Sequence, residues 1–239
     1  MKDPYEAYGS LACTAESATV KAGRRNIQAD DEKRVPADVA EKLGLLPAHT
    51  LLEIGCGPGA ILCPLSKKVA HATGIDHPDV IAVARAQCKS VNVTFIAGQF
   101  PAVGIKEKFD RVLAYSVLHY MPDMSAVEKF IDAATALLKP CGKLLLGDLP
   151  NADNTRRFRE SEMGKAFEVA WRARMAGELK GGDPFEIFAD ANMLRTFDDE
   201  KIVHLVARYR KAGFNVYILP QSPDLPAGYT REDMLISLP

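Results

Sequence analysis

The amino-acid sequence predicts an α/β fold: a doubly wound, mostly parallel sheet of seven strands flanked by helices, with a helical insertion after the fifth strand. Short apolar runs alternate with amphipathic segments of about a dozen residues, the pattern of parallel strands joined by crossover helices. The chain has 239 residues, enough for one large domain of this class. Its hydrophobic content of 47% and charged content of 26% are typical of a globular domain.

The apolar runs and the segments between them give the expected elements in order. Strands are predicted at 50–54, 69–75, 91–96, 111–114, 143–147, 215–219 and 234–238. Helices are predicted at 36–43, 60–68, 79–89, 125–138 and 199–212. Ser125 and Glu128 form a capping box at the start of the fourth of these helices, and Pro140 and Gly142 follow its end. In such a fold ligands bind at the carboxyl edge of the sheet.

Two regions fall outside this alternation. Residues 1–47 precede the first strand and are expected to form an arm or short lid helices, while residues 48–239 form the main domain. Within that domain, residues 151–198 are expected to be a helical cap. Its main element is a long helix at 155–177 that buries one apolar stripe. The stripe consists of Met163, Phe167, Ala170, Trp171 and Met175.

The most informative stretch is Glu53-Ile54-Gly55-Cys56-Gly57-Pro58-Gly59, in which an apolar strand ends at three alternate glycines behind an acid. Glycines in such a turn let the backbone pass close to a ligand, because a side chain would occupy the ligand's space. Asp76 follows Gly55 by 21 residues, at the end of the next predicted strand. A carboxylate there accepts hydrogen bonds from ribose hydroxyls. The two features predict a site for a nucleoside-containing cofactor.

The glycine stretch is followed in order by Gly74-Ile75-Asp76, Phe109-Asp110-Arg111-Val112 and Lys139-Pro140-Cys141-Gly142-Lys143-Leu144. Together these blocks resemble the motifs of the class I S-adenosylmethionine-dependent methyltransferases. The resemblance covers residues 48–150 closely and residues 199–239 by their pattern of elements. It implies a Rossmann-like fold, S-adenosyl-L-methionine as the cofactor and S-adenosyl-L-homocysteine as the product. Residues 48–239 would then be the methyltransferase domain.

The resemblance also implies a set of cofactor-binding residues at the strand ends and in the loops that follow them. The set comprises Glu53, Gly55, Cys56, Gly57, Gly59, Asp76, His77, Gln99, Phe100, Tyr115 and Ser116. Gln99 stands where this family usually has an acid that accepts a hydrogen bond from the adenine amine. The glutamine carbonyl can accept the same bond, and Phe100 can pack against the ring.

Two other interpretations of the cofactor loop stay open. The spacing Gly55-x-Gly57-x-x-Ala60 also fits the fingerprint of an NAD-dependent oxidoreductase. Against NAD stand Glu53 directly before the glycines and the later blocks, which dehydrogenases have no reason to share. The second alternative is a non-catalytic module that binds S-adenosylmethionine and acts through a partner, since no residue is an unmistakable catalytic group.

Methyl transfer is an in-line displacement from a sulfonium, for which an enzyme supplies alignment, and a base where the acceptor must lose a proton. His119 follows the fourth strand and is the candidate general base, because imidazole titrates near neutral pH. Otherwise it packs against the next helix or contacts the cofactor. Asp148 follows the fifth strand and is a candidate base or acceptor-binding group, or else a turn residue before Pro150. The five cysteines are scattered without a C-x-x-C pair, so no metal site is predicted and reduced thiols are expected.

The expected acceptor is a small molecule. A segment at 226–236 resembles the tails of bacterial methyltransferases of surface-polysaccharide and other secondary pathways, which favours O-methylation of a sugar or a similar hydroxyl compound. A net charge of −1 and the lack of a basic stripe argue against nucleic acid. No apolar stretch approaches the roughly 20 residues that span a bilayer, and the N-terminus lacks the apolar core of a secretory signal. A cytoplasmic protein is therefore expected, with a homodimer as a possible assembly.

Overall fold

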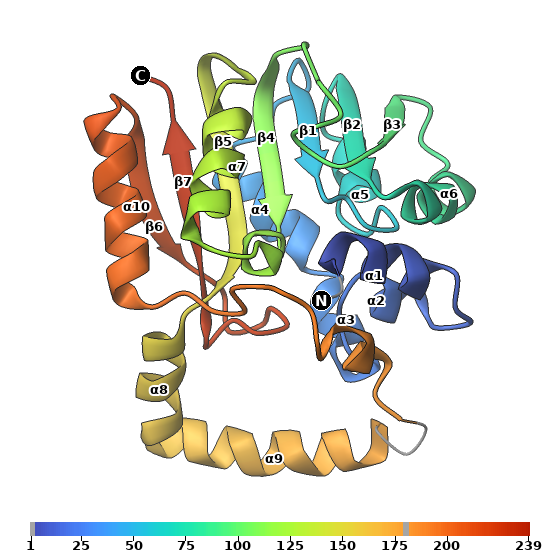
Figure 1. Cartoon of the computed structure of the whole chain (residues 1–239), viewed down its shortest axis with the longest axis vertical. Helices are drawn as coiled ribbons and strands as arrows, with labels where there is room; N and C mark the ends of the chain where they lie inside the picture. The colour runs from blue at the N-terminus through green and yellow to red at the C-terminus, as the bar shows by residue number, and fades with distance from the viewer. Residues whose placement is uncertain (1–2, 179–181) are drawn as a thin grey trace.

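Seven strands of the described residues form one sheet, with helices on both of its faces (Figure 1). This computed structural model describes residues 3–178 and 182–239; residues 1–2 of the predicted arm and 179–181 of the predicted cap lie outside them. The strands are β1 (Thr50–Ile54), β2 (His71–Asp76), β3 (Val93–Ala97), β4 (Phe109–Tyr115), β5 (Leu138–Pro150), β6 (Asn215–Pro220) and β7 (Arg231–Ser237). Their order across the sheet is β3-β2-β1-β4-β5-β7-β6.

The helices fall into three groups. Those that flank the sheet are α4 (Val35–Leu43), α5 (Leu62–Ser66), α6 (Pro78–Gln87), α7 (Met124–Thr135) and α10 (Asp199–Lys211). The arm contains α1 (Pro4–Ala12), α2 (Ala18–Lys21) and α3 (Ala29–Glu32), and β5 is followed by α8 (Ala152–Glu160) and α9 (Glu162–Glu178). Single 3-10 turns are η1 (Asn26–Gln28), η2 (Leu118–Tyr120) and η4 (Pro184–Phe188). The predicted alternation of strands and helices is confirmed.

The sheet is mixed rather than wholly parallel. Strands β1 to β5 pair in parallel, whereas β7 runs antiparallel to both β5 and β6. The loop at 221–230 joins β6 directly to its neighbour β7, and a direct connection between adjacent strands reverses the chain direction. The predicted seven-stranded α/β sheet with flanking helices is confirmed, and the antiparallel strand is the last one in the sequence.

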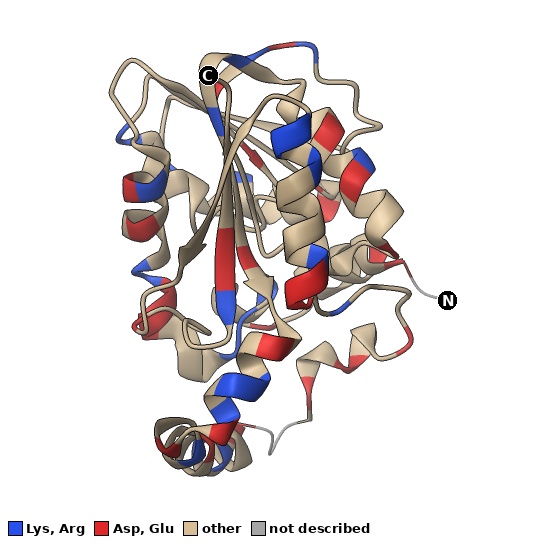
Figure 2. Cartoon of the chain, turned by 90° about the vertical axis from the view of Figure 1, so that its left-hand side faces the viewer, with Lys and Arg blue, Asp and Glu red and all other residues tan. Residues whose placement is uncertain are grey.

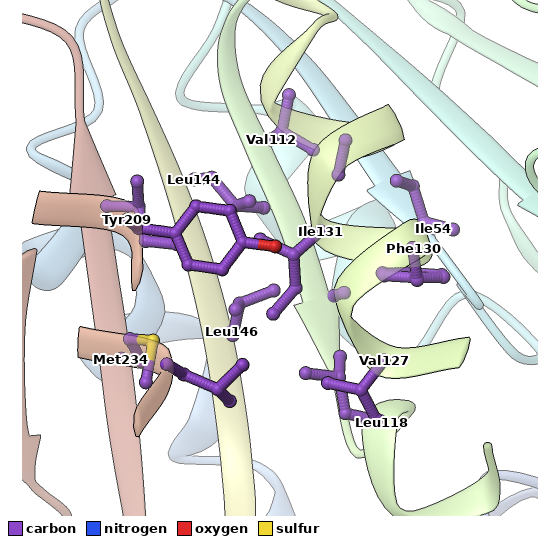
Figure 3. Packing of buried hydrophobic residues seen from close by; sticks show 14 of the residues in the cluster. Ile54, Val112, Leu118, Val127, Phe130, Ile131, Leu144, Leu146, Tyr209 and Met234 are labelled. Atoms are coloured by element: carbon purple, nitrogen blue, oxygen red, sulfur yellow. The ribbon is translucent and has the colours of Figure 1, made fainter. Parts of the chain in front are cut away.

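Successive residues of the central strands point to opposite faces of the sheet, so each strand contributes to two cores. On one face, Leu144 and Leu146 of β5 pack with Ile131 of α7 and Tyr209 of α10 (Figure 3). On the other face, Leu145 packs in a cluster that includes residues of α4, α5 and α6. Burying such a side chain stabilises the fold by about 1.5–3 kcal/mol. The two cores hold the ends of the strands, and hence the site, in fixed positions.

The arm is helical and packs near the carboxyl ends of the strands. Leu11 of α1 belongs to a third apolar cluster together with Phe188 and Ala191, which follow α9 in the chain. Tyr8 donates a hydrogen bond from its hydroxyl to the hydroxyl of Tyr120, just beyond β4, over 2.6 Å. The arm is thus tied to the same edge of the sheet at which the cofactor loop lies.

The segment after β5 differs from the single helix predicted at 155–177. It folds as α8 and α9, which are separated by Ser161, and the Ser161 hydroxyl accepts a hydrogen bond from the Gly164 N–H over 3.0 Å. The predicted burial of an apolar stripe on this segment was wrong, because Met163 is 56% exposed and Phe167 is 40% exposed. Phe167 contacts other aromatic rings, among them Trp171. Helical spacing identified the stripe but could not show whether another element covers it.

The start of α7 also differs from its prediction. The cap is the Asp123 side chain, which accepts a hydrogen bond from the Ala126 N–H over 2.9 Å, so the predicted capping box of Ser125 and Glu128 was wrong. An ionised carboxylate is favoured at a helix N-terminus, where it also interacts with the positive end of the helix dipole.

The expectation of reduced cysteines was wrong for one pair. Cys63 of α5 and Cys88 at the end of α6 are joined by a disulfide, with their Cα atoms 5.8 Å apart. The two residues are 25 positions apart in sequence, and the packing of both α5 and α6 against β2 brings them together. Cys13, Cys56 and Cys141 are free.

Positions occupied by Lys or Arg and positions occupied by Asp or Glu are interspersed along the helices in the view of Figure 2. Such mixing, with a net charge of −1, gives no single-sign stripe along that face. None of the described helices is both long and apolar enough to cross a membrane.

Candidate active site

The cofactor loop begins where β1 ends at Ile54. Its three glycines have positive φ angles: +75° for Gly55, +54° for Gly57 and +88° for Gly59. Residues other than glycine rarely adopt such angles. A Cβ atom added to Gly55 would lie 2.6 Å from Cγ2 of Val117, whereas one added to Gly57 would meet nothing within 4 Å. At Gly55 the loop therefore packs against Val117, in the segment that follows β4, and at Gly57 it faces open space.

Asp76 lies at the end of β2, beside this loop. One oxygen of its carboxylate accepts a hydrogen bond from the Gly57 N–H and the other accepts one from the His77 N–H, each over 2.7 Å. Burial raises the pKa of Asp76 above its usual value, against the effect of these two N–H donors. Each oxygen keeps a further lone pair that can accept a hydrogen bond from a ligand hydroxyl.

A cavity of about 520 Å³ opens at the carboxyl edge of the sheet. Seven of the predicted cofactor-binding residues line it: Gly55, Gly57, Asp76, Gln99, Phe100, Tyr115 and Ser116. Glu53 and Cys56 line a smaller neighbouring cavity, while Gly59 and His77 line neither. The structure thus brings together residues from the ends of β1, β2, β3 and β4, as the parallel topology requires.

His77 faces the arm. Its ring lies 4.8 Å from that of Tyr5, and its Nε2 atom lies 3.5 Å from the Glu6 carboxylate. Its Nδ1 atom accepts a hydrogen bond from the Asp79 N–H over 3.2 Å and so caps α6. His77 therefore fixes α1 beside the loop.

Several residues that line the large cavity were not predicted. Among them are Asp3, Pro4, Tyr5, Tyr8, Lys21 and Ala22 of the arm, Tyr120 and Met121 after β4, and Asn192 after η4. None of the described residues of α8 and α9 lines it. Tyr5 and Tyr8 stand out as large groups in a polar arm, which is a sequence signal, whereas only the folded chain shows the position of Asn192.

Asp148 and Ser116 face each other across the ends of β5 and β4. Both have φ angles of +60°, an uncommon conformation for residues other than glycine. Ser116 donates a hydrogen bond to the Asp148 carboxylate, and Arg24 of the arm donates to both side chains, with 2.8 Å between its Nη2 atom and Oδ2 of Asp148. No motif or spacing in the sequence points to Arg24, which lies 124 positions from its partner.

The charge state of Asp148 follows from its neighbours. Burial raises the pKa of Asp148, but the guanidinium groups of Arg24 and Arg231 outweigh this effect and lower it to about 2. Asp148 is therefore ionised at neutral pH, although it is almost completely buried. Its backbone N–H donates to Asp233 over 2.8 Å, and Lys42 donates to the same Asp233 carboxylate over 2.7 Å.

His119 lies in η2, close to this ion pair. Burial, followed by the charge of Arg231, lowers its pKa to about 3, so the ring is neutral at neutral pH. Its Nδ1 atom is buried without a hydrogen-bond partner, and its ring lies 4.2 Å from that of Tyr120. Neither His119 nor Asp148 lines the two cavities, but each adjoins residues that line the larger one.

Part of the chain matches a known protein family. The model of the methyltransferase-domain family matches residues 51–142. A curated ubiquinone biosynthesis O-methyltransferase of Paramagnetospirillum magneticum is 40% identical over 125 residues, which are 51% of this chain and 48% of that protein. The same enzyme of Rhodopseudomonas palustris is 27% identical over 139 residues, 56% of this chain and 53% of that protein. The chain thus spans about half the length of the curated relatives it matches.

The fold extends beyond the matched region. The N-methyltransferase NodS of Bradyrhizobium japonicum, solved with S-adenosyl-L-homocysteine, superposes over 100% of both chains with a TM-score of 0.61 at 16% identity. The family match decides between the two interpretations of the glycine loop in favour of S-adenosylmethionine over NAD. We conclude that the chain carries a methyltransferase domain over residues 51–142 and shares the Rossmann-like fold of class I S-adenosylmethionine-dependent methyltransferases.

Proposed function

We propose that this protein transfers a methyl group from S-adenosyl-L-methionine to a hydroxyl group of a small molecule. The observation that carries the proposal is the continuous cavity that runs from Gly57 and Asp76 to Tyr120 and Met121. In-line transfer needs the sulfonium and the acceptor oxygen in one space, aligned at about 3–3.5 Å. The curated relatives are named as O-methyltransferases, which supports oxygen as the methylated atom.

In this proposal the cofactor lies at the loop end of the cavity. The Asp76 carboxylate accepts hydrogen bonds from the ribose hydroxyls, and the backbone of Gly55 and Gly57 borders the methionine part of the cofactor. Gln99 accepts from the adenine amine, and Phe100 packs on the base. Glu53 and Cys56 line the smaller cavity behind the loop, and His77 and Gly59 support its shape. When bound, S-adenosylmethionine supplies the electrophilic methyl group.

The acceptor would lie at the other end, below Tyr8 and Tyr120. His119 is the residue that we propose takes the hydroxyl proton, since its ring is buried beside this end of the cavity with Nδ1 unpaired. Its lowered pKa of about 3 makes it a weaker base than the near-neutral imidazole expected from the sequence. Asp148 is held ionised by Arg24 and Ser116 and would position the acceptor. A sugar or a similar hydroxyl compound stays the proposed substrate class, and a small molecule is favoured over nucleic acid by the chain's charge.

The domain boundaries are part of the same proposal. Residues 48–239 form the methyltransferase domain, and residues 1–47 act as a lid because α1 residues line the cavity. The cap at 151–198 contributes through Asn192 and not through α9. Assembly as a homodimer and a cytoplasmic location stay predictions.

The test is titration calorimetry followed by turnover. S-adenosylhomocysteine should bind with one site per chain, and NADH should not compete with it. Transfer of a labelled methyl group to members of a panel of sugars, phenols and hydroxy acids should then be detected. Failure to bind S-adenosylhomocysteine would refute the proposal, and binding without turnover on any acceptor would favour the non-catalytic module. His119→Ala should lower kcat by more than tenfold and leave the Kd for S-adenosylhomocysteine within twofold if His119 is the base.

A further inference from the structure

The disulfide between Cys63 and Cys88 lies directly behind the cofactor loop. The Cys63 N–H donates a hydrogen bond to the carbonyl oxygen of Gly59, the third glycine of the loop, over 3.0 Å. A Cβ atom added to Gly59 would lie 2.7 Å from the Sγ atom of Cys63, so this sulfur packs on the glycine. The position of the Cys63 sulfur is therefore coupled to the position of the loop.

The segment that the disulfide closes carries a second part of the cofactor site. Cys63 and Cys88 are 25 positions apart, and the chain between them contains β2 and Asp76. The Asp76 carboxylate accepts the hydrogen bond from the Gly57 N–H over 2.7 Å. The closed segment thus contacts the loop at two places, Cys63 and Asp76. A change in the disulfide acts on both of them.

A small reagent can reach the pair. Cys63 and Cys88 are both half-buried, whereas Cys56 of the loop is buried. A dithiol reduces such a pair by thiol–disulfide exchange: its first thiolate attacks one sulfur and forms a mixed disulfide, which its second thiolate then resolves. Two electrons and two protons pass to Cys63 and Cys88, which become thiols, and the dithiol becomes a disulfide. The reverse exchange restores the bond.

Reduction changes the packing behind the loop. A covalent bond between two sulfurs is replaced by a non-bonded contact, which is longer, so at least one sulfur must move. The Cys63 sulfur already packs on Gly59. Its helix, α5, has five residues, and a helix of this length depends on its tertiary contacts because it is marginal on its own. Without the link to α6, the loop and the start of α5 are held less firmly.

We infer that Cys63 and Cys88 form a redox modification site through which a dithiol controls the binding of S-adenosylmethionine. The chain binds the cofactor tightly when the pair is a disulfide and more weakly when the pair is reduced. This inference goes beyond the proposed function, since it concerns the condition under which the cofactor binds and not the acceptor that is methylated.

The experiment compares two redox states of the full chain. One sample is kept with an excess of lipoate, a cyclic disulfide, and the other with an excess of dihydrolipoate, its dithiol form. Thiols counted after denaturation should number three in the first sample (Cys13, Cys56 and Cys141) and five in the second. Titration calorimetry then measures the Kd of S-adenosylhomocysteine for each sample.

The reduced chain should bind S-adenosylhomocysteine about tenfold more weakly, because small displacements in a ligand site have effects of this size or larger. Its melting temperature should be about 6–12 °C lower, with a cooperative transition in both samples. Cys88→Ala leaves the Cys63 sulfur beside Gly59 without a bond, so it should bind like the reduced chain under both conditions. Cys141→Ala, at an exposed thiol outside the pair, is the matched control and should respond like wild type.

The thiol count and the melting curve identify the step that fails. Equal Kd values for the oxidised and reduced chains would overturn the inference, as would a pair that lipoate does not oxidise or dihydrolipoate does not reduce. A reduced chain without a cooperative transition would also overturn it, since the disulfide would then serve the whole fold. Binding to neither state would refute the proposed function as well, whereas equal binding to both states leaves that proposal intact.

Discussion

The cofactor end of the cavity and the ion-pair network that adjoins the cavity around Asp148, called the Asp148 end below, are built by different means. At the cofactor end, the glycine loop and Asp76 lie within one short stretch of the sequence, and the contact between them is made by the Gly57 backbone N–H. At the Asp148 end, charged side chains from the arm, β5 and β7 meet, and Arg24 pairs with a residue 124 positions away. A site made from local backbone can be recognised in a sequence, whereas one made from distant side chains depends on the whole fold.

The first prediction tests the buried charges of the Asp148 end. Arg24→Met removes one partner of an ion pair whose side chains are 13% and 3% exposed, and it leaves a buried carboxylate with the more distant Arg231. Breaking such a pair costs about 3 kcal/mol of unfolding free energy. Urea unfolding measures the loss. Arg208→Met, which breaks an exposed pair with Asp132, should cost less than about 1 kcal/mol. Similar losses in both variants would show that the buried pair contributes no more to the free energy of unfolding than an exposed one.

The second prediction tests the backbone of the cofactor end. Gly57→Ala places a methyl group in the open space beside the loop and should weaken S-adenosylhomocysteine binding by about a hundredfold, roughly 2.7 kcal/mol. Gly213→Ala is the matched control. Gly213 also has a positive φ angle, +95°, and an added Cβ would meet nothing within 4 Å, but this residue lies just after α10 and does not line the cavity. Both variants should lose about 1 kcal/mol of stability from backbone strain. Only Gly57→Ala should lose affinity, and equal affinities would mean that the ligand lies elsewhere.

The third prediction concerns the pH dependence of the Asp148 end. The pKa of His119 is lowered to about 3 in the folded state, against about 6.5 for an unfolded chain. As pH falls below 6.5 the unfolded chain binds a proton that the folded chain does not, so stability is lost progressively down to about pH 3. From pH 7 to pH 5 this amounts to about 2 kcal/mol. His119→Gln should remove this loss of stability between pH 7 and pH 5, which urea unfolding at both pH values measures. His71→Gln, which changes an exposed ring, is the control and should keep the loss.

The same contrast explains what the sequence could predict. The strands and the glycine loop follow from apolar runs, from glycine spacing and from an acid at a strand end, which are local properties of the chain. They point to Gly57 and Asp76, which line one cavity. The cap of α7 was missed because two acceptable caps, Asp123 and Ser125, lie close together, and sequence alone does not rank them.

The Asp148 end could not be predicted in the same way. Arg24 and Arg231 lie in segments without a motif, and their roles depend on the mixed sheet and on how the arm packs. The apolar stripe of α9 was predicted to be buried because its spacing is that of a packed helix, yet no described element covers Met163. Periodicity reports the face of a helix, while its burial is decided by the tertiary structure.

The fourth prediction has the smallest expected effect and joins the two ends. Asp76→Ala should weaken S-adenosylhomocysteine binding by at least about tenfold, roughly 1.4 kcal/mol, because it removes the ribose acceptor and the hydrogen bond that holds the Gly57 N–H. Asp79→Ala, at an exposed carboxylate on α6, is the control and should leave the Kd within twofold. The unfolding free energy of Asp76→Ala should change little, because the variant also removes a buried carboxylate whose pKa is raised by burial. An unchanged Kd would show that the ribose does not bind at β2, and a large loss of stability would mean that Asp76 serves the fold rather than the cofactor.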